Sequence, residues 1–224
     1  MLTLDRTRAQ EPHALKQAKR EKCTWDNLSS EQRSEIRQCL AEWQHHLCAY
    51  CERPIKTGSA TPSCHIEHFL KRDLFPGKTF EWSNLFLSCS NEDTCGKAKD
   101  KSIKRNDAQK NESLIAPGKA CASIFVVTPL GRMEVHEACP QELKARAQRT
   151  IDAFNLNDIK LVSQRKNIFK QFKDLPDCSC EEQIELLTSI IDKVGFPSVF
   201  DELLGIDSLA EVQSYLEASE CPAD

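Results

Sequence analysis

Apolar positions along the first third of the chain predict one clear helix after a basic arm. Between residues 30 and 46 they recur at the three- and four-residue spacing of a helix face. Ser29 followed by Gln32 is a capping-box start for that helix. Residues 1–27 carry six Lys and Arg side chains with little apolar periodicity, which predicts a basic arm with one short helix.

Short apolar runs between loop signals then predict two strands. The segments 64–69 and 85–87 are apolar enough for short strands, and the Pro- and Gly-containing residues 70–82 separate them as a loop. Residues 97–106 are highly charged and free of Gly and Pro, which favours a helix there.

The second half of the sequence is mostly helical by its hydrophobic period. The runs 124–127 and 133–135 flank Pro129-Leu130-Gly131, which predicts a β-hairpin. Helical spacing of apolar residues follows in four segments: 143–154, 157–172, 184–191 and 209–216. The predicted fold class is therefore α+β.

Charge is divided unevenly over the 224 residues. Residues 1–120 hold 20 Lys and Arg against 16 Asp and Glu, a net +4, whereas residues 121–224 carry a net −8. A polyanionic ligand would favour the first half. The overall net charge of −4 argues against a strong nucleic-acid binder acting alone, so a partner is expected to supply much of the affinity for nucleic acid.

The opening residues are too charged for a secretory leader, and no apolar run reaches about 20 residues. The sequence therefore predicts a cytoplasmic protein without a membrane span.

Two pairs among the twelve cysteines have spacings that suggest a metal site. In a reducing compartment such cysteines indicate metal binding or buried thiols rather than disulfides. Cys48-x-x-Cys51 can place two thiolates on one tetrahedral zinc ion, and Cys89 with Cys95 supplies a second, more widely spaced pair. The alternative is that all four are reduced cysteines packed as small hydrophobic side chains.

Between these pairs lies His65-Ile66-Glu67-His68. Because side chains alternate along a strand, His65 and Glu67 are expected on one face, with His68 on the other or at the strand end. Taken alone, a histidine near a strand is usually a hydrogen-bonded structural residue. Asn84, directly ahead of the second strand, adds a candidate second-shell hydrogen-bonding group.

Together these motifs resemble a known nuclease family. They are Cys48-x-Tyr50-Cys51, His65 through Phe69, Trp82 through Cys89, and Cys95-Gly96-x-x-Lys99. The set is similar to the zinc-bound HNH, or ββα-metal, nucleases. More narrowly it resembles the PtuB-like HNH component of Septu anti-phage systems, some of which are retron-associated. The close resemblance covers about residues 48–105.

The resemblance implies a three-part chain with a metal-dependent nuclease in the middle. The parts would be a basic arm and helix (1–46), a zinc-bound HNH core (47–105), and a hairpin plus helical partner-binding region (106–224). Structural zinc would sit on Cys48, Cys51, Cys89 and Cys95. The implied partners are a PtuA-like ATPase, a nucleic acid (DNA, or RNA such as tRNA) and, in retron-associated systems, a reverse transcriptase with its RNA–DNA product.

The same resemblance assigns the catalytic roles. His68 would be the general base that activates water, since an imidazole titrates near pH ~6.5. Glu67 would bind magnesium or another divalent cation, which prefers oxygen ligands. Asn84 would fix the loop that aims His68.

The sequence departs from the family pattern directly after the last zinc cysteine. Many HNH nucleases have His or Asn there, whereas this chain has Gly96. His65 could supply the missing ligand, and the remaining candidates are Asn91, Asp93, Asp100 and, as a phosphate-holding group, Lys99. A zinc-ribbon adaptor that binds nucleic acid or protein without cleavage is therefore the alternative function.

Lysines that follow the last zinc cysteine are candidate phosphate contacts, which would give affinity without sequence preference. They are Lys97, Lys99 and Lys101. The alternative interpretation is a solvated helix face, because acidic residues are interleaved with them.

Overall fold

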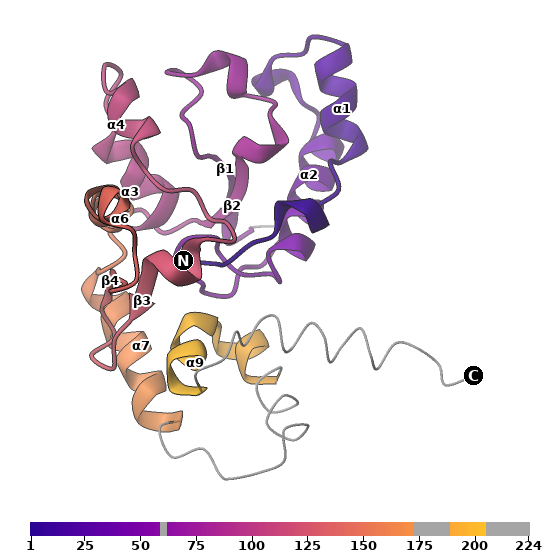
Figure 1. The fold of residues 1–224 in the computed structure, drawn as a ribbon. Coiled ribbons are helices and arrows are strands. Elements are labelled where there is room, and N and C mark those ends of the chain that lie inside the picture. The colour runs from indigo at the N-terminus through magenta and orange to yellow at the C-terminus, as the bar shows by residue number, and fades with distance from the viewer. Residues whose placement is uncertain (59–61, 173–188, 205–224) are drawn as a thin grey trace.

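Two antiparallel hairpins and a set of short helices make up residues 1–58, 62–172 and 189–204, the part of the chain that this computed structural model describes (Figure 1). The strands are β1 (Cys64–His68), β2 (Leu85–Cys89), β3 (Phe125–Val127) and β4 (Met133–Val135). The α-helices are α1 (His13–Arg20), α2 (Ser30–Trp43), α3 (Cys95–Ser102), α4 (Ala108–Glu112), α5 (Cys121–Ile124), α6 (Gln141–Ala153), α7 (Ile159–Phe172) and α9 (Pro197–Leu204). Single 3₁₀ turns occur at Arg6–Arg8, Trp25–Asn27, Pro76–Lys78 and Trp82–Asn84. The predicted α+β class is confirmed.

The first hairpin lies between two groups of helices. β1 and β2 pair antiparallel, with Cys64 opposite Cys89 and His68 opposite Leu85. Figure 1 shows α1 and α2 on one side of this hairpin and α3 with α4 on the other. The outer edge of β2 is closed by the buried Gln44 amide, which accepts from the Leu87 N–H (2.7 Å) and donates to the Leu87 carbonyl (3.0 Å). This pairing satisfies backbone groups that an open edge would leave to solvent.

The N-terminal arm is packed against the hairpin. Leu2 and Leu4 are buried, and the Leu2 N–H donates to the Ala49 carbonyl at 3.1 Å. The Arg6 guanidinium lies 3.7 Å from the centre of the Trp43 ring and donates to the Leu85 carbonyl at 3.1 Å. Arg6, which was predicted to belong to a basic arm, is thus held by a cation–π contact with Trp43. The short helix predicted within this arm is confirmed as α1.

The helix predicted at 30–46 is confirmed as α2, with the predicted capping box. The Ser29 hydroxyl accepts from the Gln32 N–H at 3.2 Å, and the Gln32 side chain accepts from the Ser29 N–H at 2.9 Å. The helix ends at Trp43, earlier than predicted, because His45 and His46 adopt left-handed φ values of 53° and 54°. This turn directs the chain into the first cysteine pair.

Other elements lie near their predicted positions. The 124–127/133–135 hairpin is confirmed as β3–β4, and its Gly131 has φ 81° at a point where a Cβ would collide with the Val162 carbonyl of α7. The helix predicted at 97–106 begins and ends earlier, as α3, because Ile103 leaves the helix to be buried in the core. The short helices α4 and α5 were not predicted.

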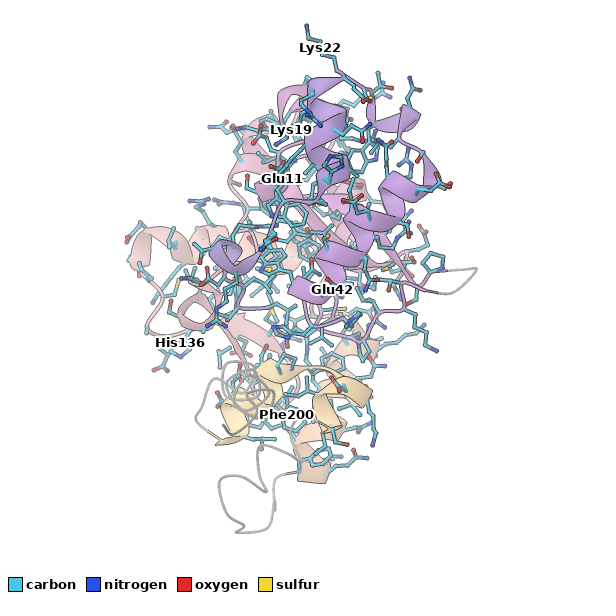
Figure 2. All side chains as sticks on the ribbon, turned by 90° about the vertical axis from the view of Figure 1, so that its right-hand side faces the viewer. Glu11, Lys19, Lys22, Glu42, His136 and Phe200 are labelled. Carbon is cyan, nitrogen blue, oxygen red and sulfur yellow. The ribbon has the colours of Figure 1, made fainter. Side chains whose placement is uncertain are left out.

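The helical half continues into α6, α7 and α9. The predicted helices 143–154 and 157–172 are confirmed as α6 and α7. Phe172 of α7 packs edge-on against Phe200 of α9, with ring centres 5.5 Å apart. Figure 2 shows Phe200 near one end of the molecule and Lys22, which follows α1, at the other. The helix predicted at 209–216 and most of that at 184–191 lie outside the described residues.

Within the described ranges, no helix is both long and apolar enough to cross a membrane.

Candidate zinc centre and active site

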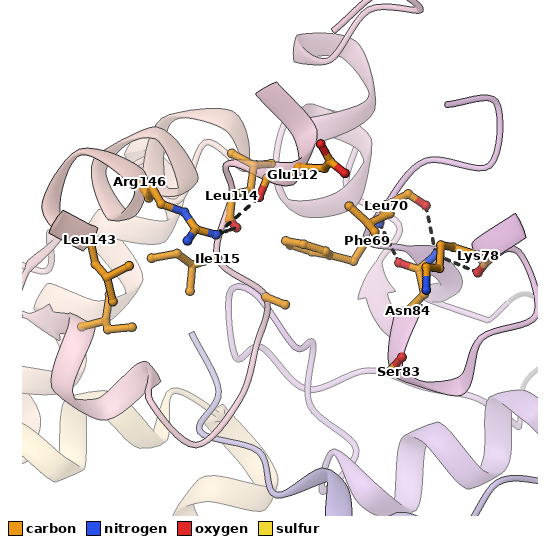
Figure 3. A pocket seen from close by; sticks show the side chains of 12 residues that line it. Phe69, Leu70, Lys78, Ser83, Asn84, Glu112, Leu114, Ile115, Leu143 and Arg146 are labelled. Atoms are coloured by element: carbon orange, nitrogen blue, oxygen red, sulfur yellow. Dashed lines mark hydrogen bonds between the residues drawn. The ribbon is translucent and has the colours of Figure 1, made fainter. Parts of the chain in front are cut away.

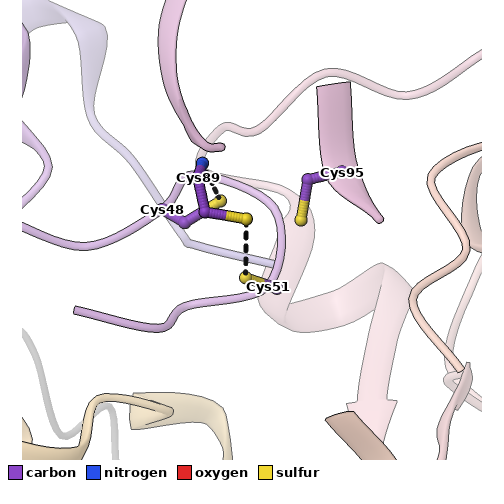
Figure 4. A group of neighbouring side chains, drawn as sticks. All are labelled: Cys48, Cys51, Cys89 and Cys95. Carbon is purple, nitrogen blue, oxygen red and sulfur yellow. Dashed lines mark hydrogen bonds between the residues drawn. The ribbon is translucent and has the colours of Figure 1, made fainter. Parts of the chain in front are cut away.

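Four cysteine sulfurs converge in the core beside the first hairpin (Figure 4). The Sγ atoms of Cys48, Cys51, Cys89 and Cys95 all lie within 4.8 Å of one another, and all four residues are buried. The Cys51 and Cys89 sulfurs are 3.9 Å apart. A tetrahedral zinc ion with Zn–S bonds near 2.3 Å separates its sulfur ligands by roughly 3.8 Å. The cluster therefore has the donor type, the number of ligands and the size of a structural zinc site, as predicted from the two cysteine pairs.

Local backbone geometry brings the two pairs together. In the first pair the chain turns back on itself, since the Glu52 N–H donates to the Cys48 carbonyl (2.9 Å) and the Cys48 N–H to the Arg53 carbonyl (2.9 Å). Cys89 is the last residue of β2, and Cys95 is the first residue of α3. The Cys95 N–H donates to the Phe154 carbonyl at the end of α6 (2.7 Å), which ties the cysteine cluster to the helical half.

Hydrogen bonds and burial act on the four sulfurs in opposite directions. The Cys89 N–H donates to the Cys48 sulfur at 3.3 Å, and the Arg53 guanidinium donates to the sulfurs of Cys51 and Cys89, both at 3.5 Å. Burial raises the pKa of the Cys48 thiol. Contacts from the other three sulfurs lower the pKa of Cys89. A cation at the centre would stabilise all four thiolates, because a bound metal ion deprotonates its thiol ligands.

His68 stands at the end of β1 with a fixed ring orientation. Its Nε2 lies 3.0 Å from the Thr79 carbonyl oxygen, which can only accept, so Nε2 carries the proton of a neutral imidazole and Nδ1 is the basic nitrogen. Trp25 packs edge-on against the ring, with centres 4.4 Å apart. Burial and the nearby Arg72 lower the pKa of His68 to about 4. The imidazole is thus neutral at physiological pH and able to accept a proton.

Asn84 closes the loop that holds the Thr79 carbonyl (Figure 3). Its amide nitrogen donates to the carbonyls of Leu70 and Lys78, both at 3.0 Å, and its oxygen accepts from the Leu70 N–H at 2.7 Å. The Lys78 carbonyl belongs to the residue next to Thr79. The amide therefore fixes both the start of this loop and the part of it that contacts His68. Asn84 also lines a cavity of about 450 Å³ between this loop and α6, drawn in Figure 3 and separate from the cavity at His68 described below.

Glu67 is buried, and each of its two carboxylate oxygens has its own polar neighbour. Oε2 lies 3.2 Å from His65 Nε2, which agrees with the predicted shared strand face. Oε1 forms an ion pair with the Lys99 ammonium. Burial raises the pKa of the Glu67 carboxyl, but Lys99 and His65 lower it by more, to about 2. Glu67 is therefore ionised at neutral pH.

Gly96 leaves no space for the side chain that many HNH nucleases carry after the last zinc cysteine. A Cβ at Gly96 would lie 2.5 Å from Glu67 Oε2 and 2.7 Å from the carboxyl carbon. The carboxylate thus rests directly on the first turn of α3, where negative charge is favoured by the helix dipole. Within the described parts of the chain, the cysteine cluster is the one group of three or more Cys, His, Asp and Glu side chains close enough to hold a metal ion.

A cavity of about 570 Å³ opens beside these groups. Its lining is mostly polar, and it includes the predicted site residues His65, Glu67, His68 and Lys97. Further lining residues are Trp25, Ile66, Lys71, Arg72, Asp73 and Asp100. The cavity thus presents the candidate base and its acidic neighbour together with several cations.

The three lysines expected at a phosphate differ in position. Lys97 lines the cavity and is 42% exposed, with its ammonium 3.7 Å from Glu92. Lys101 is 59% exposed, does not line the cavity, and donates to the Glu92 carbonyl at 2.6 Å. Lys99 is fully buried, so its ammonium cannot contact a surface phosphate in this arrangement.

Three features of the site were not predicted from the sequence. Trp25, in the chain before α2, and the Thr79 carbonyl, in the loop after β1, both contact His68. Asn111 of α4 accepts from the Lys71 N–H (3.0 Å) and donates to the Phe69 carbonyl (2.9 Å), which fixes the chain just after His68. A backbone acceptor such as Thr79 has no residue-type signal, and a single aromatic or amide side chain is too common to single out.

Part of the chain is similar in sequence to a bacterial defence-system protein. It is 27% identical over 124 residues to Septu protein PtuB from Bacillus thuringiensis, a match that covers 55% of this chain and 42% of that protein. The matched region therefore spans less than half the length of that relative. No protein-family model matches the chain. The match supports a relationship to PtuB at the level of sequence, in agreement with the resemblance carried by the motifs.

Proposed function

We propose that this chain is a metal-dependent HNH endonuclease that hydrolyses phosphodiester bonds in nucleic acid as the effector of an anti-phage defence system. The observation that carries the proposal is the pairing of His68 Nε2 with the Thr79 carbonyl. This hydrogen bond leaves Nδ1 as the basic nitrogen of a ring that lines a cavity shared with Glu67. A general base needs an unprotonated nitrogen of this kind, held in one orientation next to its substrate.

The order of elements supports an HNH-type core. β1, β2 and α3 follow one another, and the zinc cluster joins the chain before β1 to the end of β2 and the start of α3. In this arrangement His68 accepts a proton from the attacking water through Nδ1. Asn84 keeps the Lys78–Thr79 segment in place, and Trp25 limits rotation of the imidazole. These side chains position the base and do not themselves react.

Glu67 is the proposed protein ligand for the catalytic divalent cation. Magnesium is commonly held by one or two carboxylates with water and substrate phosphates in its other positions, so a single buried carboxylate at the cavity suits it. His65, whose Nε2 lies 3.2 Å from Glu67 Oε2, is the proposed substitute for the metal ligand that is missing at position 96. When bound, such an ion supplies positive charge for the phosphate oxygens and the leaving group. Lys97 is the candidate phosphate contact at the rim.

The similarity to Septu protein PtuB carries the biological part of the proposal. Septu systems pair a PtuB-type nuclease with the ATPase PtuA, so we propose a PtuA-like ATPase as partner and a cytoplasmic site of action. Retron-associated systems would add a reverse transcriptase and its RNA–DNA product. The net charge of −4 fits a nuclease that relies on its partner for much of its grip on DNA or RNA.

A zinc-stabilised adaptor that binds without cleaving is the second candidate, and two observations favour it. Gly96 supplies no metal ligand, and Glu67 is already neutralised by Lys99. In the adaptor, substitution of His68 or Glu67 would leave the defence phenotype intact, whereas loss of Cys48 or Cys51 would abolish it.

The deciding experiment compares His68→Ala with His13→Ala, a change at an exposed histidine of α1. The zinc-loaded proteins, with the PtuA-like partner present, are incubated with plasmid, phage DNA and tRNA in magnesium. We expect cleavage by wild type and His13→Ala and none by His68→Ala. Equal cleavage by all three would refute His68 as the base. Equal phage protection by all three would favour the adaptor.

A further inference from the structure

Lys99 is a buried cation of the site with four oxygen neighbours. Its ammonium donates to the carbonyls of His68 (2.7 Å) and Phe69 (3.2 Å), lies 3.2 Å from Asp100 Oδ1, and forms an ion pair with Glu67 Oε1. The side chain has no exposed surface. A lysine ammonium is rarely buried this completely unless it is paired. The Lys99 ammonium therefore interacts with buried groups of the site and not with solvent.

The position of this ammonium bears directly on metal binding. Glu67 is 3% exposed and cannot remain ionised at that depth without a positive neighbour. Lys99 supplies that charge at Oε1, which is one of the two atoms through which the carboxylate would hold a divalent cation. On the Oε2 side, Gly96 brings helix α3 against the carboxylate and leaves no room for a ligating side chain at position 96, so His65 is the ligating side chain next to Oε2.

We propose that Lys99 is the resident cation of the Glu67 site, and that a divalent ion binds Glu67 only by displacing the Lys99 ammonium from it. This inference rests on the proposed function in one respect, namely that Glu67 is a ligand for a divalent ion. It adds a determinant of metal affinity that lies in the chain itself. The affinity of the resting protein for magnesium is set by the competition between Lys99 and the ion.

The displaced ammonium has other partners within reach. The His68 and Phe69 carbonyls already accept from it, and Asp100, whose carboxylate is 47% exposed, lies at the cavity. Lys99 can therefore leave Glu67 while keeping three oxygen neighbours. Its contact with the His68 carbonyl also means that the exchange takes place at the residue that carries the candidate base.

The first test is manganese binding to zinc-loaded protein, measured by calorimetry. Lys99→Met removes the charge and keeps much of the side-chain volume. Lys101→Met is the matched control, because Lys101 lies on the same helix and is 59% exposed. We expect Lys99→Met to bind manganese at least about tenfold more tightly than wild type, because a competing unit charge in contact with the carboxylate has gone. Lys101→Met should bind as wild type does. Equal affinity of all three proteins would overturn the proposal.

Thermal melting keeps the test decisive if Lys99→Met is unstable. An unpaired buried carboxylate should lower its melting temperature, and manganese should restore it by taking the place of the ammonium. The double variant Lys99→Met/Glu67→Gln has no charge at either of these two positions, so manganese should leave its melting temperature unchanged. If manganese fails to stabilise Lys99→Met more than wild type, Lys99 is only a structural contact and the proposal is wrong.

A measurement on wild-type protein completes the design. The ¹⁵N resonance of the Lys99 ammonium should shift when magnesium is added, with a Lys101 resonance as reference. Magnesium binding through Glu67 that leaves the Lys99 resonance unmoved would overturn the displacement. None of these readouts depends on cleavage, so inactivity of the protein as a nuclease would leave them interpretable.

Discussion

Asn84→Ala tests whether the loop between β1 and β2 is held by a single amide. The Asn84 side chain is 5% exposed and makes three hydrogen bonds, two donated and one accepted, all to backbone groups of the same loop. A buried hydrogen bond of this kind contributes about 1 kcal/mol net. Loss of three predicts destabilisation by about 3 kcal/mol. Typical domains have about 5–15 kcal/mol of stability, so the variant should still fold.

The assay is urea unfolding of zinc-loaded protein at pH 7, followed by tryptophan fluorescence and circular dichroism. Asn106→Ala, at an exposed asparagine, is the control and should change stability by less than about 0.5 kcal/mol. Asn84→Asp is a second probe. It keeps an acceptor for the Leu70 N–H but turns a carboxylate toward the Leu70 and Lys78 carbonyls, so it should destabilise at least as much as the alanine.

The same variants report on the position of the base. The Lys78 carbonyl held by Asn84 precedes Thr79, whose carbonyl accepts from His68. Cleavage by Asn84→Ala should therefore fall by more than its folded fraction explains. If Asn84→Ala loses less than about 1 kcal/mol, the three hydrogen bonds do not hold this loop. If stability falls and cleavage per folded molecule is unchanged, the loop does not position His68.

Three further outcomes are expected. Zinc removal with a strong chelator, or Cys48→Ser, should unfold the hairpin region, because zinc ligation contributes about 10–16 kcal/mol in small metal domains; a melting curve unchanged by the chelator would mean that the cysteines only pack. An NMR titration of the His68 ring should give a pKa near the expected value of about 4, below the ordinary 6.5. Since the unfolded chain then takes up the proton first, His68 should cost stability as the pH falls from about 6.5 toward 4, and a midpoint near 6.5 would contradict its burial. Trp25→Ala should raise the pKa of His68, because Trp25 covers the ring; an unchanged titration would assign the shift to other neighbours.

The parts of the fold that could be predicted are those in which local signals and burial agree. The Ser29–Gln32 capping box and the period of α2 both specify the same helix, and Gly131 fits the tight turn of β3–β4 against α7. Element ends were less predictable, because tertiary contacts decide them. Ile103 leaves α3 to enter the core, and two left-handed histidines end α2.

For the candidate site, the sequence indicated the side chains that could carry the chemistry. It could not indicate the residues that hold those side chains in position. The cysteine spacings predicted a cluster that the structure assembles. The surface role expected for Lys99 depended on its charge alone, and charge does not show whether a lysine faces solvent or a buried carboxylate. Only the packing of α3 against β1 reveals that Lys99 and Glu67 are partners.

The four-cysteine cluster and the candidate active site are joined through helix α3. Cys95 begins this helix, and Lys99 lies four residues later, about one turn along. Gly96, between them, is in contact with Glu67. A zinc ion that fixes Cys95 would therefore also fix the position of the Lys99 ammonium relative to Glu67 and the His68 carbonyl. Because the last metal ligand and the resident cation share one turn of helix, loss of zinc should disturb the base and the carboxylate before it disturbs α6 or α7.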